Sequence, residues 1–387
     1  TYASLKGSYS LTADRGPATN SLAVFTSFTP WRPSTPAFES GITLEALENS
    51  ELTYEKKHEL NIGVAFGFVD NRVNVEFDWY RRNNFDLIGF TQTMGVGGVT
   101  TKLANDATMQ STGCEFTIST TNIKTKDFKW TTDWIFGWAE NEITKLDSRS
   151  QVYQLVLGYG RTVNRPIGAL YSIPFAGLTE EGLPTFYIDA EQTQIAGPGN
   201  YDAIYFQEYE NVDYLKYEGS IDPTITGSFG NTFTWKGLKL NVFFTYSFGN
   251  VLRLDNLCPV YSSDYSDLTA SMKEMKNRWM VPGDEQLTTI PSIPTVRQMR
   301  EINALNNAYS AYNYSTERVA KGDFIRLKEL SLAYDLPKKV FEGQKAVSSF
   351  GVKFSATNLW LAYADKKLNG RDPEYYNTGG VSSPNPR

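Results

Sequence analysis

The sequence predicts an all-β fold: a segment of a transmembrane antiparallel β-barrel with long loops at one end. Three observations carry this prediction. Apolar and polar residues alternate over long stretches, aromatic residues make up 14% of the 387 residues, and short connections alternate with long ones. No stretch approaches the roughly 18 to 20 apolar residues that a membrane helix needs. A net charge of −6 with scattered basic residues argues against nucleic-acid binding, which needs clustered Lys and Arg.

The clearest hairpin lies in the stretch 57–81, with a two-residue turn at Asp70-Asn71, since both residue types tolerate positive φ. In this register Phe66 opposes Val75, and every apolar residue meets an apolar residue across the hairpin. A slip by one residue would put each of them on the wrong face.

The stretch 224–248 passes the same test. A turn at Lys236-Gly237 places Phe229 opposite Phe244 and leaves small or polar residues on the other face. In a further stretch, 324–336, the apolar face changes midway, which predicts a bulge or an exit from the membrane. Together the patterns predict nine strands, over residues 3–13, 57–68, 72–90, 112–121, 128–140, 223–235, 238–248, 323–336 and 348–360.

Strand length and loop length favour a membrane barrel over a soluble sheet. Eleven residues at ~3.3 Å span roughly 36 Å, or about 26 Å in height at a ~45° tilt, which matches the ~25 Å apolar band of outer-membrane barrels. Connections of about 2 to 11 residues alternate with connections of about 20 to 80, as in bacterial barrels with periplasmic turns and extracellular loops. Aromatic residues near strand ends are predicted to form the interfacial girdles: Trp79, Tyr80, Trp138, Trp235 and Tyr246.

Charged residues opposite the apolar face should line the barrel interior, because a charge facing lipid costs about 2–4 kcal/mol for Arg or Lys at mid-bilayer. Arg72, Glu76 and Asp78 are the residues predicted to do so. Val75→Arg or Phe244→Arg should then block membrane assembly, whereas Glu76→Gln should be tolerated.

Nine strands do not close a barrel, because single-chain bacterial barrels have even strand numbers and an open edge would lie in lipid. We therefore expect residues 1–387 to be the C-terminal part of one barrel domain, in a longer protein with further strands.

Four blocks resemble the C-terminal half of the barrel of SusC/RagA-family TonB-dependent transporters of Bacteroidetes outer membranes. They are YEKKHELNIGVAFGFVDNRVNVEFDWYRRNNFDLI (54–88), RPIGALYSIPFAGLTEEGLPTFY (165–187), IDPTITGSFGNTFTWKGLKLNVFFTYSFGN (221–250) and GDFIRLKELSLAYDLP (322–337), in the family's order. The resemblance implies a barrel of about 22 strands with an N-terminal plug. It also implies a SusD-like lipoprotein lid, dimers of transporter–lid pairs, and import of oligosaccharides or peptides driven by TonB-ExbB-ExbD. The plug, its TonB box and an aromatic-ended closing strand are not found in these residues, so those features rest on the resemblance alone.

No residue set predicts catalysis or a resident cofactor. His58 is the only histidine in the sequence. We expect it to be a charged residue at the membrane interface and not a member of a Ser-His-Asp catalytic triad. Glu180-Glu181 and Asp264/Asp267 are carboxylates of the type that binds Ca²⁺, but solvated loop charge is the simpler interpretation.

Other features have equally plain interpretations. Cys114 and Cys258 match no metal spacing, and the sequence does not support a disulfide between them. The run Gly95-Val96-Gly97-Gly98 does not lead into a helix, so it does not predict a phosphate loop. Asn313-Tyr314-Ser315 fits the N-glycosylation sequon, which has no expected significance in a bacterial protein. Thr1 could be an N-terminal nucleophile, but the start of a partial chain explains it more simply.

Long loops around 141–222 and 249–322 are rich in Tyr, Asn and Asp, which suits sugar or peptide capture and equally suits packing against a partner. The tyrosines concerned are Tyr201, Tyr205, Tyr209, Tyr261, Tyr265, Tyr309 and Tyr312. The substrate-binding residues stay open at this stage. Two other functions also stay open: a soluble β-rich carbohydrate-binding protein, and a porin for passive diffusion.

Overall fold

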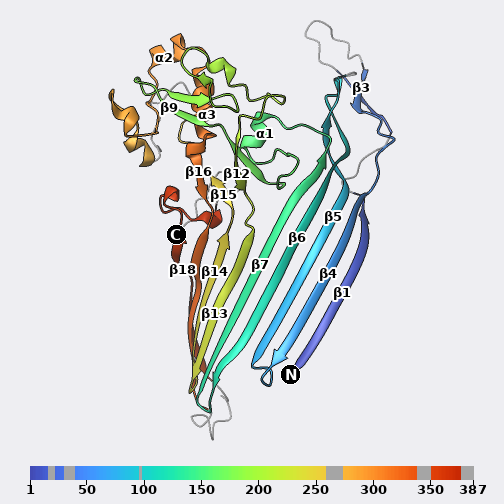
Figure 1. Ribbon diagram of the computed structural model, residues 1–387, viewed down its shortest axis with the longest axis vertical. Coiled ribbons are helices and arrows are strands. Elements are labelled where there is room, and N and C mark those ends of the chain that lie inside the picture. Colours follow the sequence, from blue (N-terminus) through green and yellow to red (C-terminus); the bar gives the residue numbers. More distant parts are fainter. Residues whose placement is uncertain (16–21, 30–39, 96–97, 259–272, 338–349, 376–387) are drawn as a thin grey trace.

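The computed structural model describes residues 1–15, 22–29, 40–95, 98–258, 273–337 and 350–375. Its largest element is one antiparallel sheet of nine strands, which lie side by side in chain order (Figure 1). The nine strands are β1 (Tyr2–Asp14), β4 (Glu55–Phe68), β5 (Val73–Gln92), β6 (Thr101–Lys124), β7 (Phe128–Leu146), β13 (Ile225–Trp235), β14 (Leu238–Phe248), β17 (Phe324–Asp335) and β18 (Gly351–Ala364). The predicted order and antiparallel pairing are confirmed.

The first predicted hairpin has the expected register, with Phe66 paired to Val75 between β4 and β5. Asp70 and Asn71 have φ values of 53° and 60°, as a tight hairpin turn requires. Arg72 is a correction, because it lies in this turn and not on the strand. Its backbone N–H donates to the carbonyl of Val69 at 3.0 Å and closes the hairpin.

The second predicted hairpin is also confirmed, with Phe229 paired to Phe244 between β13 and β14. Lys236 and Gly237 form its turn with φ values of 45° and 92°. A side chain at Gly237 would bring its Cβ within 2.5 Å of the Asp335 carbonyl, so the turn needs glycine there for space as well as for conformation.

A bulge lies in β17 where the apolar face was predicted to change. Phe243 pairs with Glu329 and Phe244 pairs with Leu327, so Lys328 has no partner on β14. The extra residue reverses the inward and outward alternation, which explains the two out-of-phase apolar series in this stretch.

Strands β5, β6 and β7 are longer than predicted. β5 continues to Gln92, β6 begins at Thr101, and β7 continues to Leu146, so the connection predicted at about 20 residues is a short loop instead. The missed part of β6, residues 101–111, lacks apolar alternation. This part of β6 projects beyond the rest of the sheet (Figure 1). Neither face of the strand contacts lipid there, so no alternation of apolar and polar residues is required.

The long connections gather at one end of the sheet, and the tight turns lie at the other end (Figure 1). We call residues 147–224, 249–258 and 273–323 the loop domain. Its strands are β8 (Ala169–Ser172), β9 (Phe175–Leu178), β10 (Pro184–Tyr187), β11 (Ile195–Ala196), β12 (Lys216–Ser220), β15 (Val251–Arg253) and β16 (Val319–Lys321). Its helices are α1 (Val152–Val156), η2 (Tyr201–Ala203), η4 (Lys273–Asn277), η5 (Asp284–Gln286), α2 (Val296–Glu301), α3 (Leu305–Asn313) and η6 (Thr316–Arg318).

Outside the loop domain, β2 (Val24–Phe28) and β3 (Gly41–Ala46) form a separate hairpin, and η8 (Lys366–Leu368) and η9 (Pro373–Tyr375) follow β18. The large buried core lies in the loop domain and not in the sheet, and its most buried members include Val152, Ile173, Phe186, Tyr201, Ala308 and Tyr312. Among the described residues, no helix is long and apolar enough to cross a membrane, a result that concerns helices alone.

One apolar row crosses the entire sheet. Each member pairs with the next, and the row contains Ala3, Phe66, Val75, Ile118, Trp134, Phe229, Phe244, Leu327 and Trp360. Trp134, Phe229 and Trp360 stay 36–59% exposed, which is unusual for side chains of this size in a soluble sheet. The outer face therefore carries an apolar residue of this row on every one of the nine strands, as the barrel interpretation requires.

Candidate functional site

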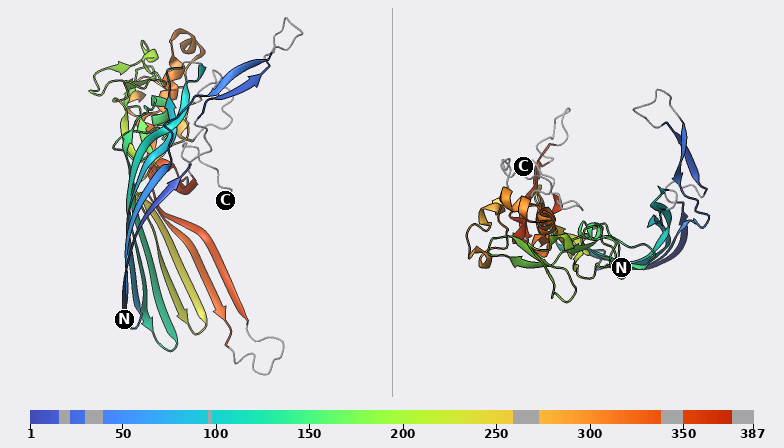
Figure 2. Two further views of the ribbon diagram at one scale, coloured as in Figure 1. Left: turned by 90° about the vertical axis from the view of Figure 1, so that its right-hand side faces the viewer. Right: turned by 90° about the horizontal axis from the view of Figure 1, so that it is seen from above.

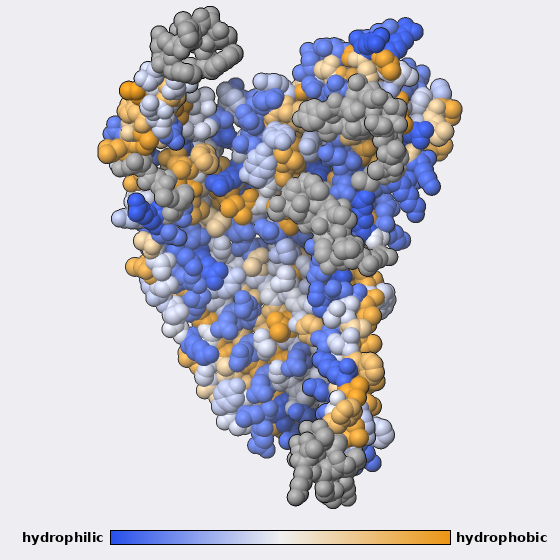
Figure 3. All heavy atoms as spheres, turned by 180° about the vertical axis from the view of Figure 1, so that it is seen from behind, coloured by the Kyte–Doolittle hydropathy of each residue, from blue (hydrophilic) through white to orange (hydrophobic). Residues whose placement is uncertain are grey.

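The opposite face of the sheet is a polar wall. Figure 2 shows that the sheet is curved, and Figure 3 shows hydrophilic side chains over much of the strand region seen from behind. A row on this face, one residue out of phase with the apolar row, contains Ser4, Ala65, Glu76, Thr117, Ile135, Ser228, Thr245, Arg326 and Leu361. Glu76 and Asp78 lie on the polar face, as predicted.

The wall is acidic on β5, β6 and β7. Asp78 pairs directly with Glu115, and Glu76 lies two residues from Asp78 on the same strand. Asp133 on β7 accepts a 2.7 Å hydrogen bond from the Ser119 hydroxyl. Like charges directly opposite each other destabilise a sheet, so this part of the wall suits contact with water or with cationic groups.

Tyr80 is a correction to the predicted girdle. It follows Trp79 directly, and successive strand residues point to opposite faces, so both cannot face lipid. Trp79 is on the outer face in line with Cys114 and Trp138, whereas Tyr80 lies on the polar wall. Its ring lies over the position opposite on β6, where a side chain at Gly113 would bring Cβ within 2.5 Å of the Tyr80 hydroxyl.

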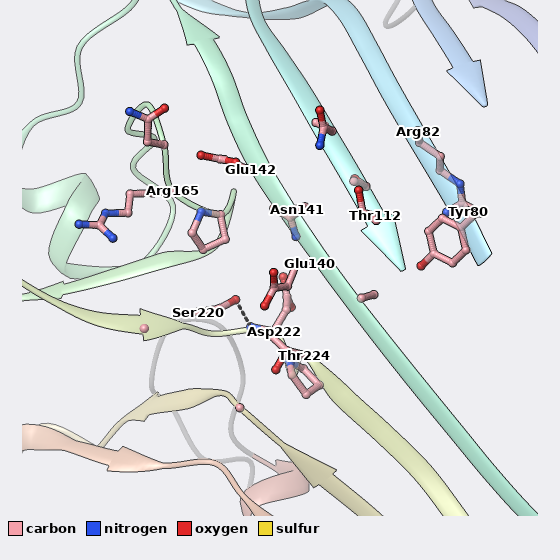
Figure 4. Close-up of a pocket in the computed structure, with 18 of the residues that line it drawn as sticks. Tyr80, Arg82, Thr112, Glu140, Asn141, Glu142, Arg165, Ser220, Asp222 and Thr224 are labelled. Carbon is pink, nitrogen blue, oxygen red and sulfur yellow. Dashed lines mark hydrogen bonds between the residues drawn. The ribbon is translucent and has the colours of Figure 1, made fainter. Parts of the chain in front are cut away.

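A cavity of about 590 Å³ lies where the polar wall meets the loop domain (Figure 4). We call it the junction pocket. Strand β5 contributes Tyr80 and Arg82, β7 contributes residues 140–142, and the loop domain contributes Arg165 and Asp222.

Backbone pairing fixes the walls of the junction pocket. The Ile143 N–H donates to the Arg165 carbonyl at 3.0 Å, and the Asn141 side chain accepts from the Ile167 N–H at 2.8 Å. The Ala139 N–H donates to the Thr224 carbonyl at 2.9 Å and extends the contact between β7 and the segment before β13. The pocket is therefore continuous with the barrel strands.

Both signs of charge are present in the junction pocket. The Arg82 guanidinium lies 4.3 Å from the centre of the Tyr80 ring and contacts Glu59 at 3.0 Å, and Arg165 lies 4.2 Å from the Tyr217 ring. Burial raises the pKa of Tyr217, although the charge of Arg165 opposes that shift. Asp222 supplies the opposite charge from the loop domain, whereas Glu140 and Glu142 line the pocket from the face of β7 that carries Trp138.

Arg253 holds the loop domain together from its interior. It is 5% exposed, and its guanidinium donates to the Ser172 hydroxyl and to the carbonyls of Ser315, Val156 and Tyr171 at 2.6–3.2 Å. Complete burial lowers its pKa to about 10, although nearby Glu218 opposes that shift, so the side chain stays charged at neutral pH. The sequence signal was a single arginine within the apolar run 251–254.

The loop tyrosines divide into two groups. Tyr201, Tyr309 and Tyr312 are at most 2% exposed and pack in the core of the loop domain, which favours the packing interpretation for them. Tyr205 and Tyr209 are 56% and 42% exposed, so they are available for contact. Tyr261 and Tyr265 lie outside the described residues.

His58 lies near the upper end of β4, where its Nδ1 is 3.1 Å from the Tyr9 hydroxyl and its ring meets Phe85 edge-on. Both of these contacts are aromatic residues, and neither is a Ser or Cys nucleophile. Thr1 is exposed at the start of the described chain.

The described residues contain no group of three or more His, Cys, Asp or Glu side chains that could hold a metal. Glu180 and Glu181 are exposed, and Asp264 and Asp267 lie outside the described ranges. Cys114 is a free thiol on the outer face of β6, and Cys258 is a free, buried thiol in the loop domain.

Asn313 of the sequon is fully buried. Its side chain accepts from the N–H groups of Leu257 and Cys258 at 3.0 and 3.1 Å and donates to the Cys258 carbonyl at 2.8 Å. These bonds give the asparagine a structural role. The Gly98 N–H donates to the Gly95 carbonyl at 3.0 Å, and strand β6 begins at Thr101, so no α-helix follows the glycine run; residues 96–97 lie outside the described ranges.

Comparisons with known proteins agree with this geometry. No protein-family model matches the chain. It is 27% identical over 354 residues to TonB-dependent receptor P3 of Formosa agariphila, covering 87% of this chain and 32% of the relative. It is 34% identical over 99 residues to TonB-dependent receptor SusC of Bacteroides thetaiotaomicron, covering 25% of this chain and 10% of that relative.

Among solved structures, the RagAB peptide importer in its closed-closed state aligns with a TM-score of 0.71 and 23% identity. That alignment covers 99% of this chain and 39% of the other. The chain spans about a third of the length of the curated relatives that match most of it. The curated relatives are TonB-dependent receptors, and the solved structure is a peptide importer.

Proposed function

Since this chain belongs to the SusC/RagA type of TonB-dependent outer-membrane transporters, we propose that it forms part of the barrel of an active importer for a large nutrient. The observation that carries the proposal is the register of the sheet. An unbroken apolar row on one face crosses all nine strands, and the row on the opposite face is polar on six of them, the exceptions being Ala65, Ile135 and Leu361.

The mechanism is gated passage, in which no bond is made or broken by the residues described. The apolar rows contact lipid, the polar wall lines the path, and the loop domain forms the external mouth. We further propose that a plug and additional strands belong to the same protein, because β1 and β18 are edges of the sheet among the described residues. A SusD-like lipoprotein is the proposed lid; the RagAB importer is a two-component complex by its name.

Two measurements test this function. The intact mass of the polypeptide from detergent-solubilised outer membranes should be well above 43.5 kDa. Affinity purification through this chain in detergent should recover a surface lipoprotein in stoichiometric amount. A mass near 43.5 kDa, or release of the protein without detergent, would contradict the large barrel and favour the soluble binding protein.

Energy coupling is tested separately, by uptake of the nutrient in cells with and without TonB. We expect uptake to require TonB. Uptake that continues at the same rate without TonB would instead identify a passive porin.

A further inference from the structure

A second cavity, of about 760 Å³, lies in the loop domain and is distinct in its lining from the junction pocket. It is formed by the start of α1, the loop of residues 204–207, Asn256 and one side of α3. We call it the loop pocket. Among the residues that the structure describes, no Asp, Glu, Lys, Arg or His lines it, although 21% of the chain is charged.

The backbone that carries the aromatic residues of the loop pocket is tied to the surrounding structure. The Tyr153 N–H donates to the Phe206 carbonyl at 2.9 Å, which ties α1 to the 204–207 loop. The Phe206 ring packs edge-on against Tyr314 at 6.0 Å between centroids. Tyr153 and Tyr205 are nevertheless 45% and 56% exposed, so ring surface is left for a ligand.

Carboxamides supply the polar part of the lining. Gln207, Asn256 and Asn306 are exposed, and their side chains make no hydrogen bond within the part of the chain that the structure describes. Each carboxamide offers two donors and one acceptor with two lone pairs. Exposed rings beside free amides match a ligand that has both apolar C–H faces and many hydroxyl groups.

The Glu208 carboxylate, next in sequence to Gln207 of the loop pocket, is engaged with its own loop. The Glu208 carboxylate accepts from the N–H groups of Tyr209 and Glu210 at 2.9 and 2.7 Å, and these bonds lower its pKa. It is therefore ionised at neutral pH and engaged with its own loop. Since no cation lines the pocket among the described residues, an anionic ligand would find no countercharge there.

We propose that the loop pocket is a capture site for a neutral oligosaccharide. Tyr153 and Tyr205 would stack on the C–H faces of the sugar rings, and the three free carboxamides would bond the hydroxyls. A peptide would place charged termini or side chains in a lining that has no countercharge, which is unfavourable on desolvation. This inference rests on the proposed import function and names the class of its substrate.

The test measures binding to the protein as the cell makes it, purified in detergent with any partner that accompanies it. The probes are neutral hexasaccharides of glucose, mannose, galactose and xylose, a hexamer of uronic acid, and a tryptic digest of casein. We expect at least one neutral hexasaccharide to bind, and neither the uronate nor the peptides to compete with it.

Two variants and one matched control assign the binding to the loop pocket. Tyr205→Ala should weaken it by about tenfold or more, and Asn306→Asp should also weaken it, because its charge lacks a partner. Tyr209→Ala removes an exposed ring outside the lining and should leave affinity unchanged. Tyr205→Trp keeps an aromatic face and should keep binding.

The proposal is overturned if no neutral hexasaccharide binds, if Tyr205→Ala leaves affinity unchanged, or if Tyr205→Ala affects only uronate or peptide binding. Failure of the import function looks different. In that case the sugar binds through Tyr205, but cells show no TonB-dependent uptake. If uptake depends on TonB and Tyr205→Ala does not alter binding, the capture site alone is wrong.

Discussion

Arginine substitutions at two adjacent residues of β5 test the facing of the entire sheet. Val75 belongs to the apolar row, between Phe66 on β4 and Ile118 on β6. Glu76 is the next residue and lies on the polar wall, between Ala65 and Thr117. Val75→Arg and Glu76→Arg therefore introduce the same side chain at nearly the same depth, on opposite faces.

The expected difference follows from the position of Val75 in the apolar part of β5. Val73, Val75, Phe77 and Trp79 form this part, and Arg81 is the first charged residue to follow on the same face. An arginine facing lipid near mid-bilayer costs about 2–4 kcal/mol, which is a factor of roughly 30 to 900 in the folding equilibrium. Glu76→Arg faces water or the plug and places its charge near Asp78, so its cost should be small.

The assay is the level of folded protein in the outer membrane, followed by urea titration of the detergent-purified protein. Val75→Arg should assemble poorly and unfold at lower urea concentration, while Glu76→Arg should resemble the parent. Equal behaviour of the two variants, whether both fail or both assemble, would refute the facing assignment.

Three further predictions concern the loop domain. Arg253→Met orphans three buried carbonyls and should destabilise it by about 3 kcal/mol or more, seen as faster limited proteolysis, whereas exposed Arg297→Met should change little. Burial raises the pKa of Cys258 from 9.0 to about 12, so maleimide at pH 8 should label it only on unfolding; the stability from this shift is present below pH 9 and is lost toward pH 12. Asn313→Asp loses the donor to the Cys258 carbonyl and should cost about 1–3 kcal/mol by the same proteolysis assay. Labelling of folded Cys258, or cleavage of the Arg253→Met or Asn313→Asp variant at the parent rate, would count against the corresponding assignment.

Sequence patterns predict the sheet because lipid and lumen impose a period of two on every spanning strand. Phe66 opposite Val75 could be inferred from alternation alone, since any slip inverts the faces. The same constraint explains the error at Tyr80, where proximity to the strand end was considered without its phase relative to Trp79.

The loop domain could not be predicted in this way. Its core forms between segments more than a hundred residues apart, such as Val156 and Tyr312, and its short strands carry no repeated alternation. Asn141 and Arg165 of the junction pocket were missed for the same reason, because their meeting depends on how the loop after β7 folds back. Buried polar anchors leave only a faint local signal, of which Arg253 between Leu252 and Leu254 is the clearest.

The membrane register also fixes the junction pocket, because β7 belongs to both. Trp134 is held in the apolar row between Ile118 and Phe229, and Asn141, seven residues later, must then point to the opposite face. A slip of β7 by one residue would turn Asn141 away from the Ile167 N–H and would move the tryptophan face of the strand from lipid to the polar wall. The hydrophobic match with lipid is therefore what sets the position of the polar groups at the mouth.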